Sequence, residues 1–187
     1  MIAETGVKKM TVAEFRELEL DDNDPFFYEL IDGELVKRNA PAPKHQRILR
    51  KLLVAIDAFI NQHQLGEVFS SPIDVFLDAA NSPQPDIVFV PKDRASIVTE
   101  NGIEGVPTLV VEIISPTSIV RDRFTKKNLY ERFGVQEYWL VDPQNQEIEI
   151  YALRESRYEL LSAATVLESQ LTSGVLAGLL IDLKTLF

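Results

Sequence analysis

Apolar positions recur along the chain at two spacings, and these spacings predict helices and strands. A helix is expected from Lys44 to about Gln64, because apolar residues recur there at helical spacing and form one stripe. They are Ile48, Leu49, Leu52, Leu53, Ile56, Phe59 and Ile60. A second helix is expected from about Ile119 to Phe133, between the capping side chains of residues 115–118 and Gly134. A short helix is also predicted around residues 11–18.

Short apolar runs separated by turn residues predict the strands. Residues 26–31 and 34–38 are expected to form a hairpin that turns at Asp32-Gly33, a strong hairpin signal. Further strands are expected over residues 67–77, 86–90, 108–114, 137–141, 147–153 and 158–161. The polar segment 91–107 predicts a long loop. The apolar tail, residues 171–187, is expected to pack on the core.

The order of these elements defines the expected fold class. A helix, three strands, a second helix and further strands predict an α/β (α+β) fold, in which helices flank a mixed sheet. The hairpin is then an N-terminal addition to this core. A length of 187 residues fits one domain over residues 1–187, with an extension at 1–24 and a core at about 26–165.

Composition and charge narrow the class of protein. The chain has no cysteine, no apolar run long enough to span a bilayer, and no signal-peptide core in its first nine residues. We therefore expect a cytoplasmic protein without a membrane partner. A net charge of −10 argues against a general nucleic-acid coat protein.

Basic residues nevertheless gather in two segments, 37–51 and 119–133. Such a basic face on an acidic body is compatible with docking a phosphate backbone, although two solvated helix faces would give the same pattern. The residues that we expect to contact nucleic acid are Lys44, Arg47, Arg50, Lys51, Arg121, Arg123 and Lys127.

Two acids lie within predicted strands. Glu112 interrupts the apolar run 108–115, and Asp86 opens the apolar strand 86–90. If these strands pair, the two carboxylates converge at one end of the sheet and repel each other. A hard divalent cation, Mg²⁺ or Mn²⁺, removes that conflict and supports phosphodiester hydrolysis. The structural alternatives are an ion pair of Glu112 with Lys126 or Arg123, and an Asp86 carboxylate bound by backbone N–H groups.

Three further residues are candidates for the same site. Lys126 shares a predicted helix face with Asp122 and Tyr130, whereas Lys127 points about 100° away. Lys126 would orient a water or neutralise the transition state, unless it is a solvent-facing residue. Glu29 is either a third acid of the site or a strand-edge acid. His45 begins the apolar stripe of its helix, so it is either a core-edge histidine or a contact to phosphate or water.

Several strings in the chain resemble a known family. They are Tyr28-Glu29-Leu30-Ile31-Asp32-Gly33-Glu34-Leu35, then Leu109 to Pro116 with its Glu-x-x-Ser-Pro strand end. The third string comprises Asp122, Lys126, Tyr130 and the run Gly134 to Asp142. Together with Pro85-Asp86, they are similar to the PD-(D/E)XK superfamily. Within it they resemble the large bacterial family of restriction endonucleases long catalogued as a domain of unknown function. The resemblance covers roughly residues 10–180.

This resemblance implies a restriction-endonuclease-like fold and a metal-dependent endonuclease that acts on DNA. It implies that Asp86 and Glu112 bind Mg²⁺ or Mn²⁺. The superfamily places a lysine two residues after the second acid, where this chain has Ile114; the resembled family moves it to the next helix, at Lys126.

A catalytically silent binding or assembly module on a nuclease fold is the alternative. A homodimer is also expected, because a two-fold pair matches the two strands of a duplex. The apolar residues available for its interface are Phe26, Phe27, Tyr138, Trp139 and the stretch 174–181.

Overall fold

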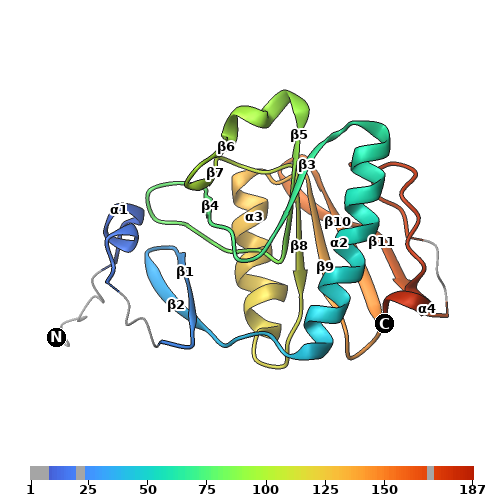
Figure 1. The fold of residues 1–187 in the computed structure, drawn as a ribbon, viewed down its shortest axis with the longest axis horizontal. Coiled ribbons are helices and arrows are strands. Elements are labelled where there is room, and N and C mark those ends of the chain that lie inside the picture. The colour runs from blue at the N-terminus through green and yellow to red at the C-terminus, as the bar shows by residue number, and fades with distance from the viewer. Residues whose placement is uncertain (1–8, 20–23, 168–170) are drawn as a thin grey trace.

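A six-stranded mixed sheet forms the centre of the protein. The computed structural model describes residues 9–19, 24–167 and 171–187 (Figure 1). In this part of the chain the sheet order is β11-β10-β9-β8-β5-β3. The strands are β3 (Gly66–Ser70), β5 (Ile87–Pro91), β8 (Leu109–Ile113), β9 (Glu137–Asp142), β10 (Glu147–Arg154) and β11 (Arg157–Thr165). Only the β8–β9 pairing is parallel in this sheet, and the other neighbours are antiparallel.

The two faces of the sheet are covered by different helices. Helix α2 (Pro43–His63) packs its apolar stripe against Leu109, Val111 and Ile113. The opposite face, with Val110 and Ile114, packs against a helix that begins as a π-helix, η2 (Arg121–Lys126), and continues as α3 (Lys127–Phe133). The predicted fold class is therefore confirmed, as a mixed sheet with helices on both faces.

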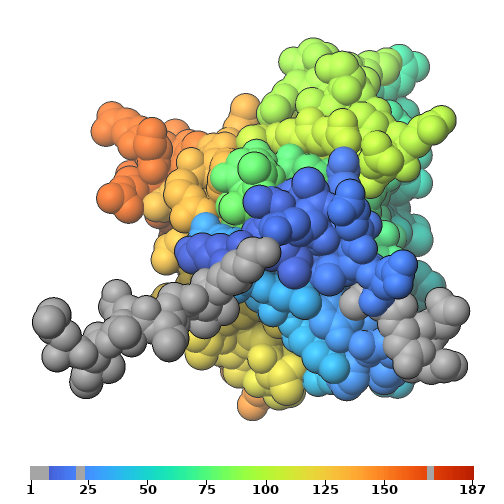
Figure 2. All heavy atoms as spheres, turned by 90° about the vertical axis from the view of Figure 1, so that its left-hand side faces the viewer, coloured from blue at the N-terminus to red at the C-terminus, as the bar shows by residue number. Residues whose placement is uncertain are grey.

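The hairpin and the N-terminal helix lie together at one side of the molecule. Strands β1 (Phe27–Ile31) and β2 (Glu34–Arg38) turn at Asp32 and Gly33, whose φ angles of 49° and 77° suit a tight hairpin turn. Helix α1 (Val12–Arg16) begins with a capping box between Thr11 and Glu14. Figure 2 shows this blue face, with the hairpin beside the yellow segment that includes η2. Residues 1–8 and 20–23 of the predicted extension lie outside the described residues.

The C-terminal tail packs on the core as predicted. Six of its apolar side chains are buried on the sheet face that α2 covers, and a short helix, α4 (Leu183–Leu186), ends the chain. Glu137 anchors the start of the tail, because its carboxylate accepts hydrogen bonds from Trp139 Nε1, the Ser173 hydroxyl and the Gly174 N–H. Trp139 and Tyr138 are fully buried in the monomer, which removes both from the surface where a dimer interface was expected.

Two predicted elements differ in the structure. The strand expected over residues 67–77 ends at Ser70, because Pro72 follows and has no N–H to continue the ladder. The chain resumes as β4 (Val75–Phe76) in a separate small sheet with β6 (Val98–Thr99) and β7 (Gly102–Glu104).

The segment 91–107 is consequently not a plain loop. It contains a 3₁₀ helix, η1 (Lys92–Ile97), followed by β6 and β7. Burial of Val75 and Ile103 in one small cluster supplies the apolar contact that orders it. Within the described residues, no helix is both long enough and apolar enough to cross a bilayer.

Candidate functional site

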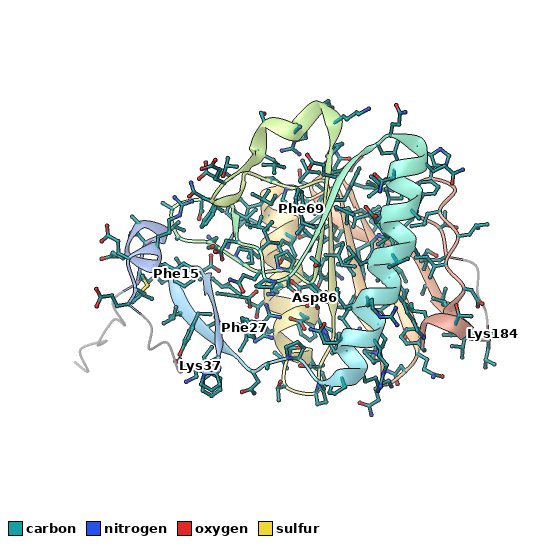
Figure 3. The ribbon with its side chains drawn as sticks, viewed as in Figure 1. Phe15, Phe27, Lys37, Phe69, Asp86 and Lys184 are labelled. Atoms are coloured by element: carbon teal, nitrogen blue, oxygen red, sulfur yellow. The ribbon has the colours of Figure 1, made fainter. Side chains whose placement is uncertain are left out.

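Asp86, just before β5, and Glu112, on β8, lie at the same end of the two strands. The antiparallel register pairs Ile87 with Val111 and Val88 with Val110, so its continuation sets Asp86 opposite Glu112. Glu112 projects from the sheet face that η2 and α3 cover, as strand alternation predicts. Asp86 lies near the centre of the molecule, between the hairpin and α2 (Figure 3). Both side chains are almost fully buried.

Three groups bind the Asp86 carboxylate. His45 Nε2 lies 3.1 Å from Oδ2, which also accepts the Ile113 N–H at 2.7 Å. Arg38 Nη2 lies 3.9 Å from Oδ1. Burial alone would raise the pKa of Asp86, but these groups outweigh it and hold that pKa below its ordinary value. The backbone N–H contact expected for Asp86 is thus present alongside a histidine and an arginine.

The Glu112 carboxylate is bound by the helix on its face. Lys126 Nζ lies 2.8 Å from Oε1, and the Tyr130 hydroxyl donates to the same oxygen at 2.9 Å. Lys126 is fully buried and also lies 2.6 Å from Glu29 Oε1. It is therefore not a solvent-facing residue, and it bridges two acids. Lys127 instead lies over the Tyr151 ring, 3.4 Å from its centroid.

The hairpin completes this network. Glu29 Oε1 accepts from Arg38 at 3.1 Å and from the Gln84 N–H at 2.7 Å, while its Oε2 has no hydrogen-bond partner among the described residues. Burial would raise the pKa of Glu29, but the charges of Lys126 and Arg38 lower it below its ordinary value. Glu29 is thus a buried member of the cluster, and the alternative of a strand-edge acid is excluded by its position.

Carboxylates outnumber fixed cations in this cluster. Within the described part of the chain, Glu29, Asp86, Glu112 and Asp122 are buried near Lys126 and Arg38. Burial raises the pKa of Glu112 to about 8 against the attraction of Lys126, and the charges of Asp122, Asp86 and Glu29 add to the rise. Burial likewise raises the pKa of Asp122. Burial is thus the largest cause of the raised pKa of both Glu112 and Asp122.

A cavity of about 320 Å³ opens onto the cluster. Asp86, Asp122 and His45 line it, together with Arg38, Gln84 and Arg121. Its walls come from three chain segments, residues 39–42, 71–72 and 115–118. Glu112, Lys126 and Glu29 are not among the lining residues, so they stand behind Asp86 and Asp122.

His45 is buried at the start of the apolar stripe of α2, as the core-edge interpretation expected, and it also contacts Asp86; a contact with phosphate or water stays a prediction. Its Nε2 lies on Asp86, and its Nδ1 lacks a hydrogen-bond partner in the described residues. Burial alone would lower the pKa of His45, but the hydrogen bond and charge of Asp86 outweigh it and raise that pKa above its ordinary value. The contact between His45 Nε2 and Asp86 Oδ2 holds the orientation of the Asp86 carboxylate.

Sequence analysis did not identify Arg38 and Asp122 as members of the site. Arg38 was grouped with the basic residues of its segment, but its guanidinium reaches Glu29, Asp86 and the Gln84 carbonyl. Asp122 was recognised only as part of a helix face. Its position four residues before Lys126 was the available signal, because residues at that spacing share a face.

The predicted nucleic-acid contacts are largely engaged within the chain. Lys44 donates to the Pro143 carbonyl, and Lys51 donates to the Thr185 carbonyl. Arg123 pairs with Asp142 and Glu149. Arg47 and Arg50 are exposed on α2, and Arg121 lines the cavity beside Asp122. A role of these residues in binding nucleic acid stays a prediction.

The donor set is suited to a hard divalent cation. No three His, Asp or Glu side chains in residues 9–19, 24–167 and 171–187 already form a metal-binding group. Mg²⁺, however, commonly uses one or two carboxylates and keeps its remaining waters. The strand register sets Asp86 opposite Glu112, and these are the two carboxylates that could hold such a cation.

Comparison with known proteins bears on the fold and the family of the chain. A search of curated proteins finds no match. Among solved structures, the chain is similar to a protein from Anabaena variabilis described as "a putative nuclease belonging to DUF820". The identity is 22%, the TM-score is 0.76, and the match covers 95% of this chain and 97% of the other. That likeness shows a shared fold.

A family comparison covers most of the chain. Residues 12–184 match the Uma2 family, whose description is "putative restriction endonuclease". The match includes every residue of the acidic cluster and the whole six-stranded sheet. The chain therefore belongs to the Uma2 family, and it has the nuclease-like fold that the sequence resemblance implied.

Proposed function

We propose that this protein is a metal-dependent endonuclease that hydrolyses phosphodiester bonds in DNA, with Asp86 and Glu112 as the ligands of Mg²⁺ or Mn²⁺. The observation that carries the proposal is the strand register that sets these two buried carboxylates opposite each other, with Asp86 lining the cavity and Glu112 behind it. A cation bound there would polarise a phosphate and lower the pKa of a water.

The surrounding residues have roles that follow from their contacts. His45 and the Ile113 N–H orient Asp86, while the Tyr130 hydroxyl and Lys126 orient Glu112. Lys126 offsets negative charge that develops on the phosphate, through the field of a buried ammonium group. Arg121 and Arg38 bring positive charge to the cavity, where a phosphate would enter.

A plasmid-nicking assay tests this proposal. Wild-type protein should nick supercoiled DNA with Mg²⁺ or Mn²⁺ and should be inactive in EDTA. Asp86→Asn and Glu112→Gln should abolish nicking, while circular dichroism shows a retained fold. Exposed Glu67 on β3 offers a matched control, and Glu67→Gln should keep full activity. Undiminished nicking by both site variants would refute the assignment.

A catalytically silent module on the same fold is the second candidate. The observation in its favour is the complete burial of Lys126 between two acids, which is also the arrangement of a structural ion network. The net charge of −10 points the same way. Thermal stabilisation by Mn²⁺ that is lost in Asp86→Ala supports the endonuclease, whereas the absence of any Mn²⁺ response supports the silent module.

We also propose that the protein is cytoplasmic and forms a homodimer. Because Tyr138 and Trp139 are buried, an interface would need other apolar residues. Val120 and Phe124 on the helix that carries Lys126 are 70% and 61% exposed, and Ile119 precedes them. These side chains are the apolar surface that a second copy would cover next to the cavity.

A further inference from the structure

The shape of the cavity bears on which form of nucleic acid can reach the acids. Asp86 and Asp122 are each only 2% exposed, so a scissile phosphate has to enter the cavity to approach them. The volume of about 320 Å³ is at the lower end of the range for small-ligand pockets, which suits about one nucleotide. Most of the residues that line the cavity come from segments 37–46, 71–72 and 113–122.

A small cavity in front of buried acids admits a flexible strand more readily than a rigid rod. A duplex presents its phosphates along a stiff cylinder, and a base in that duplex is stacked and paired. A single strand can bend, and it can place one nucleotide into a pocket at no cost in unpairing. Burial of the acids behind a small cavity therefore favours an unpaired strand over an intact duplex.

Phe27 supplies a second, independent observation. Phe27 lines the cavity, yet 39% of it remains exposed. Packing in the hydrophobic core therefore does not explain why an aromatic residue lies there. On β1 it shares a strand face with Glu29, and the register places it directly opposite Arg38 on β2. Glu29 and Arg38 both reach the acidic cluster, so the hairpin face that carries Phe27 is the face directed at the site.

An aromatic ring beside a cationic side chain is suited to binding a single-stranded nucleic acid. Single-strand binding sites combine aromatic rings, on which bases stack, with positive groups that follow the backbone. Phe27 offers the ring, and Arg38 and Arg121 offer the positive charge within the same cavity. Figure 3 shows Phe27 on the hairpin, on the side of Asp86 away from α2.

We propose that the substrate is single-stranded DNA, or an unpaired segment of a duplex, with one base stacked on Phe27 while its phosphate enters the cavity. This inference rests on the proposed function, because the strand enters the same site. It specifies the substrate class of that site, and it gives a role to an exposed aromatic residue of the hairpin.

Fluorescence anisotropy tests the proposal apart from catalysis. A labelled single-stranded oligonucleotide and the same sequence as a blunt duplex are titrated with full-length protein, with Ca²⁺ in place of Mg²⁺. We expect the single strand to bind at least about tenfold more tightly. Phe27→Ala should weaken single-strand binding by roughly 5- to 150-fold, the range for loss of one base–aromatic stack.

Two further variants separate stacking from general damage. Phe27→Trp should restore binding, because an indole ring also stacks on bases. Leu160→Ala is the control, since Leu160 is exposed on β11 but does not line the cavity, and it should bind as the wild type does. Circular dichroism on each variant verifies the fold.

The two proposals fail in different ways. Equal affinity for duplex and single strand, or unchanged binding in Phe27→Ala, overturns this inference whether or not DNA is cut. If single-strand preference and the Phe27 effect are present but no DNA is cleaved with Mg²⁺ or Mn²⁺, the substrate inference stands and the endonuclease proposal fails.

Discussion

Replacing Glu112 by Gln should stabilise the metal-free protein, although it removes a residue of the proposed active site. The Glu112 carboxyl is buried, and its pKa is raised to about 8 from an ordinary value of 4.5. Acidic groups that face it are Asp122 on η2, Asp86 beside β5 and Glu29 on β1, and the hydroxyl of Tyr130 donates to it. Positive groups that act on it are Lys126, Arg38 and His45.

The sign of the pH dependence follows from the raised pKa. A folded-state pKa above the unfolded value means that the folded protein holds the proton more tightly. The resulting stability is fully present below about pH 4.5 and is lost as the pH rises through about 8. Glutamine mimics the protonated carboxyl at every pH, so the Glu112→Gln protein should lack this loss.

The magnitude can be bounded from the same shift. At about 1.4 kcal/mol per pKa unit, ionising Glu112 costs the fold at most roughly 5 kcal/mol. The substitution also weakens the contact with Lys126, so we expect a net gain of about 1–3 kcal/mol near pH 8. That gain corresponds to a rise in Tm of roughly 3–10 °C for a chain of this length.

Thermal unfolding in EDTA, followed by circular dichroism at about pH 5 and about pH 8.5, measures the effect. The Tm of the wild type should be similar to that of Glu112→Gln at about pH 5 and lower than it at about pH 8.5. The exposed control Glu67→Gln should follow the wild type. A Glu112→Gln protein that is less stable than the wild type at the higher pH would refute the argument that ionised Glu112 destabilises the fold.

Three other predictions concern individual residues and assembly. Lys126→Ala should lower nicking by on the order of 10²-fold or more. Lys127→Ala loses only a contact over the Tyr151 ring and should have a much smaller effect. The reverse ranking would show that Lys127 acts in the site. His45→Ala should weaken stabilisation by Mn²⁺ without abolishing the fold, because Asp86 loses one of the groups that orient it; an unchanged Mn²⁺ titration would remove His45 from the site. Light scattering at micromolar concentration should give a mass near twice 21.1 kDa, and a mass near 21.1 kDa would reject the dimer.

The sequence predicted most strands of the sheet and the sheet face on which Glu112 lies, because both depend on short-range alternation. Glu112 shares a strand face with Val110, and that relation follows from a period of two residues. The burial of Lys126 against Glu112 was also among the weighed alternatives. The helical periodicity of the apolar residues likewise predicted the first and last residues of α2 to within one residue.

Other features depend on contacts between distant segments, which local patterns do not encode. The strand break after Ser70 follows from Pro72 and from the pairing of β4 with β7, about 27 residues further along the chain. Arg38 looked like one of several surface cations, but the hairpin turns it toward Glu29 and Asp86. Its role depends on how the hairpin docks, and a single sequence gives no signal for that docking.

The most direct test of the central claim is an anomalous diffraction measurement on crystals of this protein soaked in Mn²⁺. The account predicts an anomalous peak between the Asp86 and Glu112 carboxylates, at the base of the cavity, and its absence from crystals of the Asp86→Asn variant. Wild-type crystals that show no peak at this position, with both acids still held by His45 and Lys126, would contradict the proposed metal site.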